Sequence, residues 1–311
     1  MTTGRRSAGL SGVRNRLSGV RIDLHTHSTA SDGTLSPSAV IEAAADSRLD
    51  VIGLTDHDSA AGWAQAADAA AANGLMLVPG MEVSTKHAGA GVHLLAYLAD
   101  PAYPFLDEEL ALILQGREAR LAAVLEKLRD AGIDITEDEV RRQADPSPAI
   151  GRPHIADVLV AKGVVGDRSE AFDRLLDSGQ RGYVERYAAP TAAMIRLVTQ
   201  AGGAAVIAHP WGRGSRRVLD LATLTGLREA GLVGLEVDHQ DHSREDRGTL
   251  RGMAAELDLV VTGASDFHGD GKVDHELGCN LTAPAELERL LAAAAANAAA
   301  SGRGVPEVVR P

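Results

Sequence analysis

The sequence contains a single cysteine, Cys279, few aromatic residues and no excess of basic residues. One cysteine excludes an intramolecular disulfide and a cysteine-rich zinc site, and it is typical of a chain in a reducing cytoplasm. An aromatic content of 3% argues against an aromatic-rich sandwich, whereas abundant alanine and glycine favour helices packed closely on a sheet. The formal net charge of −12 argues against a protein that binds long duplex nucleic acid or a membrane surface.

The N-terminal segment 1–20 carries Arg5, Arg6, Arg14 and Arg16 among glycine and serine residues. A twin-arginine export signal requires an apolar stretch after its first arginines, and the later arginines interrupt any such stretch. No apolar run in the chain approaches the length of a membrane span. We therefore predict a disordered basic tail at 1–20 and a cytoplasmic protein without membrane contact.

Short β-like runs alternate with amphipathic helical stretches through most of the chain. The predicted strands are 20–25, 50–55, 75–80, 92–97, 203–209, 232–237 and 257–263. Several of them are continuous apolar runs, as expected for strands buried on both faces. The predicted helices between and after them are 37–47, 59–73, 190–201, 215–230, 244–257 and a final helix through "LERLLAAAAANAAASGRG". This alternation predicts parallel strands joined by right-handed crossovers.

One long segment breaks the alternation, because it contains helical patterns and no convincing strand. The patterns cover 106–131, 136–144, 153–162 and 168–178. We predict a helical insertion at 106–189, which divides the α/β barrel into the segments 21–105 and 190–300.

Histidine and carboxylate residues stand where the predicted strands end. His25 and His27 lie two residues apart, so their side chains point to the same face of the first strand. The residues that follow later strands are Asp56, His57, Glu82, His209, Asp266 and His268. Each could be an ordinary surface or structural residue, but in a closed parallel barrel all these strand ends lie on one rim. His93 stands early in its strand and is the exception, although the preceding "GAG" could bring it near the rim. We predict a metal site at this rim.

Histidine and carboxylate ligands without cysteine favour Zn²⁺, Mn²⁺ or Fe²⁺, and so many imidazoles make Mg²⁺ less suitable. Clustered cations about 3.5–4 Å apart are typical of phosphate-ester hydrolysis. The chain has no G-x-x-x-x-G-K phosphate loop and no serine in a G-x-S-x-G context. Metal-assisted hydrolysis therefore remains the reaction that these residues favour.

The motifs "DLHTHSTASDG", "LTDHD", "PGMEVS", "VHLLAY", "VIAHP" and "SDFH", in this order, resemble those of the polymerase and histidinol phosphatase (PHP) family of metal-dependent phosphoesterases. The resemblance covers roughly residues 20–285 and implies a distorted (β/α)₇ TIM-like barrel that binds two or three divalent metal ions. The ligands it implies are His25, His27, Glu82 and Asp266 for the first ion, Glu82, His93 and His209 for the second, and Asp32, His57 and His268 for the third. Asp56 would orient a ligand imidazole from behind.

The stretch "IGRPHIADVLV" at 150–160 resembles the branch of the family that acts on nucleoside 3′,5′-bisphosphates and, in some members, on the 5′ end of short RNA. Arg152 and His154 lie at the start of a predicted helix, where peptide N–H groups favour anions, and a guanidinium fork suits phosphate. "HPWGRG" adds Arg213, and "EVDHQDHS" places His239 and His242 on the rim. The predicted substrate contacts are Arg152, His154, Arg213 and His242.

From the resemblance we expect a hydrolase that removes the 3′-phosphate of a nucleoside 3′,5′-bisphosphate by attack of a metal-bound hydroxide. Glu82, Asp266 and His209 would serve catalysis, while Arg152 and His154 would hold the uncleaved phosphate. Three alternatives stay open: a 5′→3′ exoribonuclease acting on short 5′-phosphorylated RNA, a histidinol-phosphate phosphatase and a non-catalytic module bound to a polymerase. The helical insertion counts against the second, and the complete ligand set counts against the third. The oligomeric state cannot be predicted.

Overall fold

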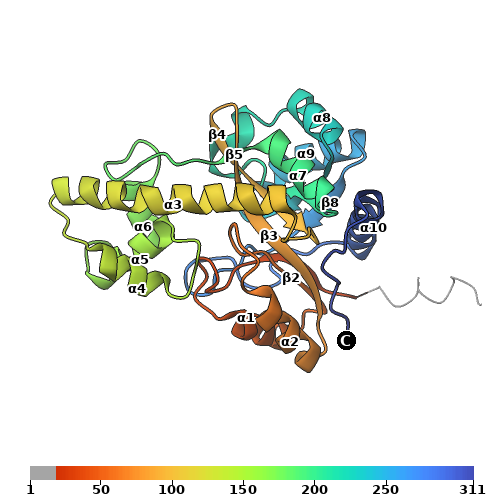
Figure 1. Ribbon diagram of the computed structural model, residues 1–311, viewed down its shortest axis with the longest axis horizontal. Helices are drawn as coiled ribbons and strands as arrows, with labels where there is room; N and C mark the ends of the chain where they lie inside the picture. Colours follow the sequence, from red (N-terminus) through yellow and green to blue (C-terminus); the bar gives the residue numbers. More distant parts are fainter. Residues whose placement is uncertain (1–18) are drawn as a thin grey trace, which may run out of the picture.

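The computed structural model describes residues 19–311, except the side chain of Arg213. The predicted tail at 1–20 therefore lies almost wholly outside the described residues. A curled sheet forms the centre of the molecule (Figure 1), and its strands follow one another in the order β1-β2-β3-β4-β6-β7-β8. The strands are β1 (Ile22–Thr26), β2 (Val51–Leu54), β3 (Met76–His87), β4 (Ala90–Tyr97), β6 (Ala204–Ile207), β7 (Leu232–Asp238) and β8 (Val260–Gly263). A two-residue strand, β5 (Ala189–Pro190), pairs with β3.

The sheet closes through loops rather than through a continuous ladder between β1 and β8. A single parallel bridge joins Thr26 to Phe267 beyond the end of β8, and the N–H of His27 donates to the carbonyl of Phe267 at 2.8 Å. Farther down the seam, the N–H of Thr282 donates to the carbonyl of Ile22 at 2.9 Å. The predicted distorted (β/α)₇ barrel is confirmed, and the irregular seam is where it departs from a regular barrel.

Helices surround the sheet (Figure 1). They are α1 (Pro37–Asp46), α2 (Trp63–Asn73), α7 (Thr191–Gln200), α8 (Leu221–Glu229), α9 (Arg244–Glu256) and α10 (Pro284–Ser301). The predicted start of α1 is confirmed, because the Ser36 side chain accepts from the N–H of Ala39 and Pro37 occupies the first turn. The helix predicted from residue 215 begins only at Leu221, where Asp220 caps it, and the short 3₁₀ helix η3 (Gly212–Arg217) precedes it.

The sequence pattern did not predict the direction of β4. It runs antiparallel to both β3 and β6, whereas the strand–helix alternation had predicted only parallel strands. A tight turn at Ala88 and Gly89, with no intervening helix, reverses the chain. Consequently the N-terminal part of β4 lies at the same rim as the C-terminal ends of the other strands, and His93 stands opposite Ser84 of β3. Because β4 runs in this direction, His93 lies at the rim with the other candidate ligands although it stands early in its strand.

The segment between β4 and β5 is helical, and its helices extend to one side of the barrel (Figure 1, left). They are α3 (Pro104–Asp130), α4 (Glu137–Ala144), α5 (Arg152–Ala161), α6 (Arg168–Ala171) and the π-helical turn η2 (Phe172–Leu176). The second half of α3 packs with the other four in a hydrophobic core of its own, while its first half packs into the barrel core. The division into a barrel and an insertion at 106–189 stays a prediction.

Across residues 19–311, no helix combines the length and the apolar character needed to cross a lipid bilayer.

Candidate metal centre

The structure brings together at one rim all nine residues predicted as metal ligands. His25 and His27 lie at the end of β1, Glu82 and His93 face each other across β3 and β4, and the remaining five lie on loops: Asp32, His57, His209, Asp266 and His268. The side chain of His93 is 18% exposed, and the others are at most 7% exposed. Strand ends and short loops thus place nine polar side chains in one largely buried volume.

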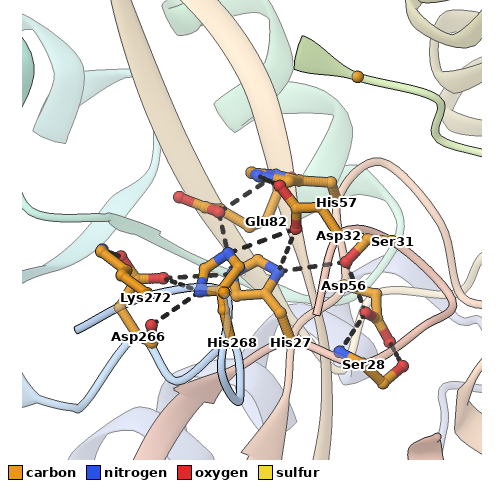
Figure 2. A network of polar contacts seen from close by, with 12 residues as sticks. His27, Ser28, Ser31, Asp32, Asp56, His57, Glu82, Asp266, His268 and Lys272 are labelled. Carbon is orange, nitrogen blue, oxygen red and sulfur yellow. Dashed lines mark hydrogen bonds and ion pairs between the residues drawn. The ribbon is translucent and has the colours of Figure 1, made fainter. Parts of the chain in front are cut away.

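These side chains form overlapping groups in which the potential ligand atoms lie within 4.8 Å of one another. The groups are His25, His27, Glu82 and Asp266; His27, Asp32, His57 and His268; and His57, Glu82 and His93. The Nε2 atom of His209 lies 3.0 Å from Glu82 Oε1 and extends the last group. Figure 2 shows Glu82 above His27 and His268, which lie side by side, with Asp266 and Lys272 to their left; Glu82 and Asp266 both approach Nε2 of His27.

Several buried nitrogen and oxygen atoms in this volume are arranged so that divalent cations could bind between them. The Nε2 atoms of His25 and His27 lie only 3.0 Å apart, so at least one lone pair faces another nitrogen. Asp32 Oδ1 and Asp266 Oδ1 are buried without a hydrogen-bond partner in the described part of the chain. Buried carboxylate oxygens without partners are costly, and a cation bound between them and the imidazoles would satisfy both. The donor set of imidazole and carboxylate suits first-row divalent metals.

In several of these histidines, one ring nitrogen is hydrogen-bonded to a residue behind the centre, so that the other ring nitrogen faces the centre. His25 Nδ1 lies 2.9 Å from Glu236 Oε1, and His268 Nδ1 lies 2.8 Å from the carbonyl of Asp266. When Nδ1–H donates to these oxygens, Nε2 keeps its lone pair, which is the arrangement found behind metal-binding histidines.

Glu236 is a functional candidate that the sequence analysis missed. It also accepts from the N–H of His209 at 2.9 Å, so one buried carboxylate holds two of the candidate ligands. The available signal was an acidic residue inside the apolar run "LVGLEV".

Opposite charges dominate the electrostatics of the centre. Burial alone would raise the pKa of Glu82, but His93, His57 and His25 hold it well below its usual range. Burial alone would also lower the pKa of His25, yet the surrounding carboxylates raise it well above its usual value. The carboxylates therefore remain ionised at neutral pH and supply negative charge to a bound cation.

Asp56 lies behind the centre and holds the loop that follows β1. It accepts from the N–H of Ser28 at 2.7 Å and from the hydroxyl of Ser31 at 2.6 Å (Figure 2). Ser31 Oγ in turn lies 3.3 Å from His27 Nδ1. Asp56 thus reaches an imidazole through Ser31 and not directly.

Two of the predicted substrate contacts use both ring nitrogens for hydrogen bonds to the backbone. His154 Nδ1 accepts from the N–H of Gly151 at 3.0 Å, and its Nε2 lies 2.9 Å from the carbonyl of Ser31. His242 Nδ1 lies 2.8 Å from the carbonyl of Val237, and its Nε2 accepts from the N–H of Trp211. While these bonds are kept, neither residue has a nitrogen for a phosphate. The side chain of Arg213 lies outside the described residues.

Arg152 belongs to a group of arginines between the barrel and the insertion helices. We call Arg117, Arg120, Arg152 and Arg186 the arginine cluster. Arg152 donates to the carbonyl of Leu176 at 2.8 Å and lies over the rings of Phe172 and Tyr183, at 5.2 and 5.8 Å from the centroids.

Two other members of the arginine cluster converge on Ser84, which is on β3 two residues after Glu82. Arg117 donates to Asp58 Oδ2 at 2.7 Å and to Ser84 Oγ at 3.1 Å. Arg186 donates to Ser84 Oγ at 2.6 Å. Because Asp58 directly follows His57, these arginines lie beside the metal centre.

Arg120 has no hydrogen bond or ion pair with any residue in the described range. Burial, followed by the charges of Arg186, Arg117 and Arg152, lowers its pKa to about 8. Arg186 responds in the same way, and its pKa falls to about 10. The sequence analysis named only Arg152 of this cluster. Arg117 is paired with Asp58, and Arg152 with Asp177 at 3.2 Å, so the four guanidinium groups keep an excess of positive charge. Such a group of buried and half-buried cations is a candidate for binding an anion.

Comparison with known proteins agrees with this chemistry. Residues 23–146 match the PHP domain family. The chain is 37% identical to a 3′,5′-nucleoside bisphosphate phosphatase from Chromobacterium violaceum, over 83% of this chain and 90% of that protein. It is 34% identical to a 5′-3′ exoribonuclease from Haemophilus influenzae, over 80% of this chain and 90% of that protein. A solved structure described as a metal-dependent phosphoesterase, from Bifidobacterium adolescentis, has a TM-score of 0.85 at 36% identity and covers 88% of this chain and 96% of its own.

Proposed function

The chain belongs to the PHP family of metal-dependent phosphoesterases, and on that basis we propose that it removes the 3′-phosphate of nucleoside 3′,5′-bisphosphates to give nucleoside 5′-monophosphates and phosphate. The observation that carries this proposal is the arginine cluster beside the metal centre. A substrate with two phosphates can place one at the metal centre and the other against the arginines. The relative from Chromobacterium violaceum, whose name states this activity, supports the same substrate.

The nine candidate ligands would hold two or three divalent cations, of manganese, zinc or iron, with magnesium less favoured by the many imidazoles. When bound, these cations neutralise the charge on the phosphoryl oxygens and lower the pKa of a coordinated water. The protein would bind three cations if the group of Asp32, His57 and His268 is occupied, and two if it is not.

Glu82 would be the central catalytic ligand. Its carboxylate lies within 3.4 Å of five imidazoles, those of His25, His27, His57, His93 and His209. Asp266 faces His25 and His27 at 3.4 Å from the other side. These two carboxylates and His209 fix where the scissile phosphate lies relative to the cations.

The arginine cluster would hold the uncleaved 5′-phosphate, so that only a substrate of the right length reaches the metal centre. Arg152 serves this role together with its three neighbours. His154 is better suited to position the loop that carries Asp32, because it is bonded to Ser31 on one side and Gly151 on the other. Direct contacts of His154, His242 and Arg213 with substrate stay predictions.

A 5′→3′ exoribonuclease is the second candidate, and the relative from Haemophilus influenzae favours it. In a short RNA the arginine cluster would bind a neighbouring phosphate of the strand. The two activities use the same centre and can coexist in one enzyme. A histidinol-phosphate phosphatase would leave the arginine cluster without a partner, because that substrate carries one phosphate. The cytoplasmic location stays a prediction based on the single cysteine.

The test is phosphate release from four substrates by protein reloaded with Mn²⁺ or Zn²⁺: adenosine 3′,5′-bisphosphate, adenosine 3′-monophosphate, histidinol phosphate and a short 5′-phosphorylated RNA. We expect the bisphosphate to give the highest kcat/KM and adenosine 5′-monophosphate as product. Arg152→Ala should lower kcat/KM about ten- to a hundredfold for the bisphosphate and little for the 3′-monophosphate, since a charge-assisted contact is worth roughly 1.5–3 kcal/mol. A preference for histidinol phosphate, or a parallel decline of both nucleotides, would overturn the proposal.

A further inference from the structure

Three residues outside the nine candidate ligands form another compact group. His239, Asp241 and His275 each offer one potential ligand atom, and these atoms lie within 4.8 Å of one another. His239 and Asp241 lie in the loop after β7, whereas His275 lies in the loop between β8 and α10. The group therefore joins two loops of the rim that are distant in sequence.

His275 has a buried lone pair that meets no donor among the described residues 19–311. Its side chain donates from Nδ1 to the carbonyl of Val273 at 2.7 Å, so the lone pair of the neutral ring is at Nε2. The residue is only 8% exposed, and its Nε2 has no hydrogen-bond partner in the described part of the chain. Burial, with Lys272 nearby, lowers the pKa of His275 and keeps the ring neutral. A histidine fixed at Nδ1 by a carbonyl is prepared to ligate a metal through Nε2.

His239 and Asp241 complete the group from the other loop. His239 is fully buried, and its Nε2 lies 3.3 Å from Asp266 Oδ2, which orients the ring. Its Nδ1 accepts from the N–H of Asp241 at 3.0 Å and lies 3.9 Å from the Asp241 carboxylate. Because Nε2–H points to Asp266, the ligand atom would be Nδ1, and a cation there would replace the N–H of Asp241. Gly212 makes room for that carboxylate, because a Cβ at position 212 would lie 2.9 Å from Asp241 Oδ2.

We propose that His239, Asp241 and His275 bind an additional Zn²⁺ ion, separate from the ions held by the nine candidate ligands. Two imidazoles and one carboxylate are a common donor set for zinc, and three protein ligands leave a position open to water. The site shares no ligand with the other groups, and it does not depend on the substrate proposed above.

The ion would cross-link the two loops beside Asp266. A hydrogen bond from the Gln240 amide to the carbonyl of Asp274, at 2.8 Å, already joins them at one point. The second loop also carries Lys272, which pairs with Asp266 (Figure 2). Binding of the ion would fix this loop, and with it Lys272, against the metal centre.

The experiment compares the full-length protein with His275→Gln, Asp241→Asn and a control, His87→Gln, which changes a histidine at the end of β3 outside every candidate group. All four proteins are stripped of metal, equilibrated with Zn²⁺ in a metal buffer and analysed for bound zinc by mass spectrometry. We expect wild type and His87→Gln to hold one equivalent more than His275→Gln and Asp241→Asn. Crystals of the zinc-loaded wild type should show an anomalous peak about 2.0–2.1 Å from His275 Nε2.

Equal zinc content in all four proteins, or no anomalous peak at His275, would overturn the inference. A loss of more than one equivalent from both variants would also overturn it, because the site would then not be separate. If His275→Gln fails to fold, as judged by its melting temperature, Asp241→Asn and the crystal decide. Turnover of the bisphosphate by the same wild-type sample reports on the proposed function independently of either result.

Discussion

The metal centre and the arginine cluster lie side by side at one rim, but they are held in place in different ways. The candidate metal ligands sit at strand ends and on short loops of the barrel, and opposite charges hold them together. The arginines come from a long helix, a helix start and an irregular segment, and like charges push them apart. The first region therefore depends on paired opposite charges, whereas the second combines repulsion among its arginines with the pairs that Arg117 forms with Asp58 and Arg152 with Asp177. Changes in the first should abolish the reaction, and changes in the second should alter which substrate is used.

The largest effect is expected for Glu82→Ala, because this carboxylate contacts five imidazoles. Loss of a shared ligand should reduce turnover by more than the about 10–100-fold that is usual for outer partners of a metal site. Phosphate release and metal content should fall together. The control, Glu229→Gln on the exposed face of α8, should leave both unchanged. Asp32→Ala should keep some turnover if the third ion is auxiliary, and an equal loss in both variants would contradict that division of roles.

A smaller effect on the same region is expected for Glu236→Gln. This change keeps the shape but weakens the hold on His25 and the N–H of His209, so metal affinity should fall about 10–100-fold. Activity should return when the metal concentration is raised, which a misfolded protein would not allow. Titration with Mn²⁺ at fixed substrate measures both. Unchanged metal affinity would show that Glu236 serves only the packing of β7.

Arg120→Met tests the second region. For the bisphosphate we expect kcat/KM to fall about ten- to a hundredfold, the cost of one charge-assisted contact, and for the 3′-monophosphate to change little. The variant should also melt at a higher temperature, because removing one of several like charges from a half-buried cluster relieves repulsion. Arg129→Met, on the exposed side of the same helix, is the matched control. A lower melting temperature would show that Arg120 stabilises the fold, which would contradict the view that its charge serves to bind an anion.

The smallest effect should appear in the pH dependence of stability, through the contact between the two regions. Burial would raise the pKa of Asp58, but Arg117 and Arg186 hold it below its usual value of 3.8. Its stabilising contribution is therefore present above pH 3.8 and is lost as the pH falls through the lower, folded-state value. Asp58→Asn should be less stable than wild type at neutral pH, by about 1–3 kcal/mol. The difference in unfolding free energy between wild type and Asp58→Asn should decrease as the pH falls. Melting curves between pH 2 and pH 7 measure this difference, and a difference that stays constant would show that another group is responsible.

The contrast between the two regions also explains what could be predicted from the sequence. Most metal ligands lie at or soon after the end of a strand, so their place on the rim follows from strand polarity, whereas the role of Asp32, in the loop after β1, was implied only by the family resemblance. His93 was the exception because an apolar pattern does not reveal the direction of a strand. The reversal depends on a turn at Ala88 and Gly89, and β3 continues to His87 through polar residues that do not resemble a buried strand.

The arginine cluster could not be predicted as a unit, because its members come from segments that meet only in the folded protein. One local signal was present. Arg117 occupies an inward position in the series Leu110, Ile113 and Leu121, which otherwise forms the buried face of α3. An arginine in such a stripe requires a buried partner, and the structure supplies Asp58. Its neighbours Arg120 and Arg186 had no comparable signal.

Helix α3 spans about 40 Å and belongs to both hydrophobic cores. Leu106, Leu110 and Ile113 anchor it in the barrel, whereas Leu121 and Val124 anchor it among the insertion helices. Arg117 and Arg120 lie on α3 between the residues that pack in the barrel core and those that pack in the insertion core. Because one continuous helix enters both cores, it ties the insertion to the barrel and sets where Arg117 and Arg120 stand between them.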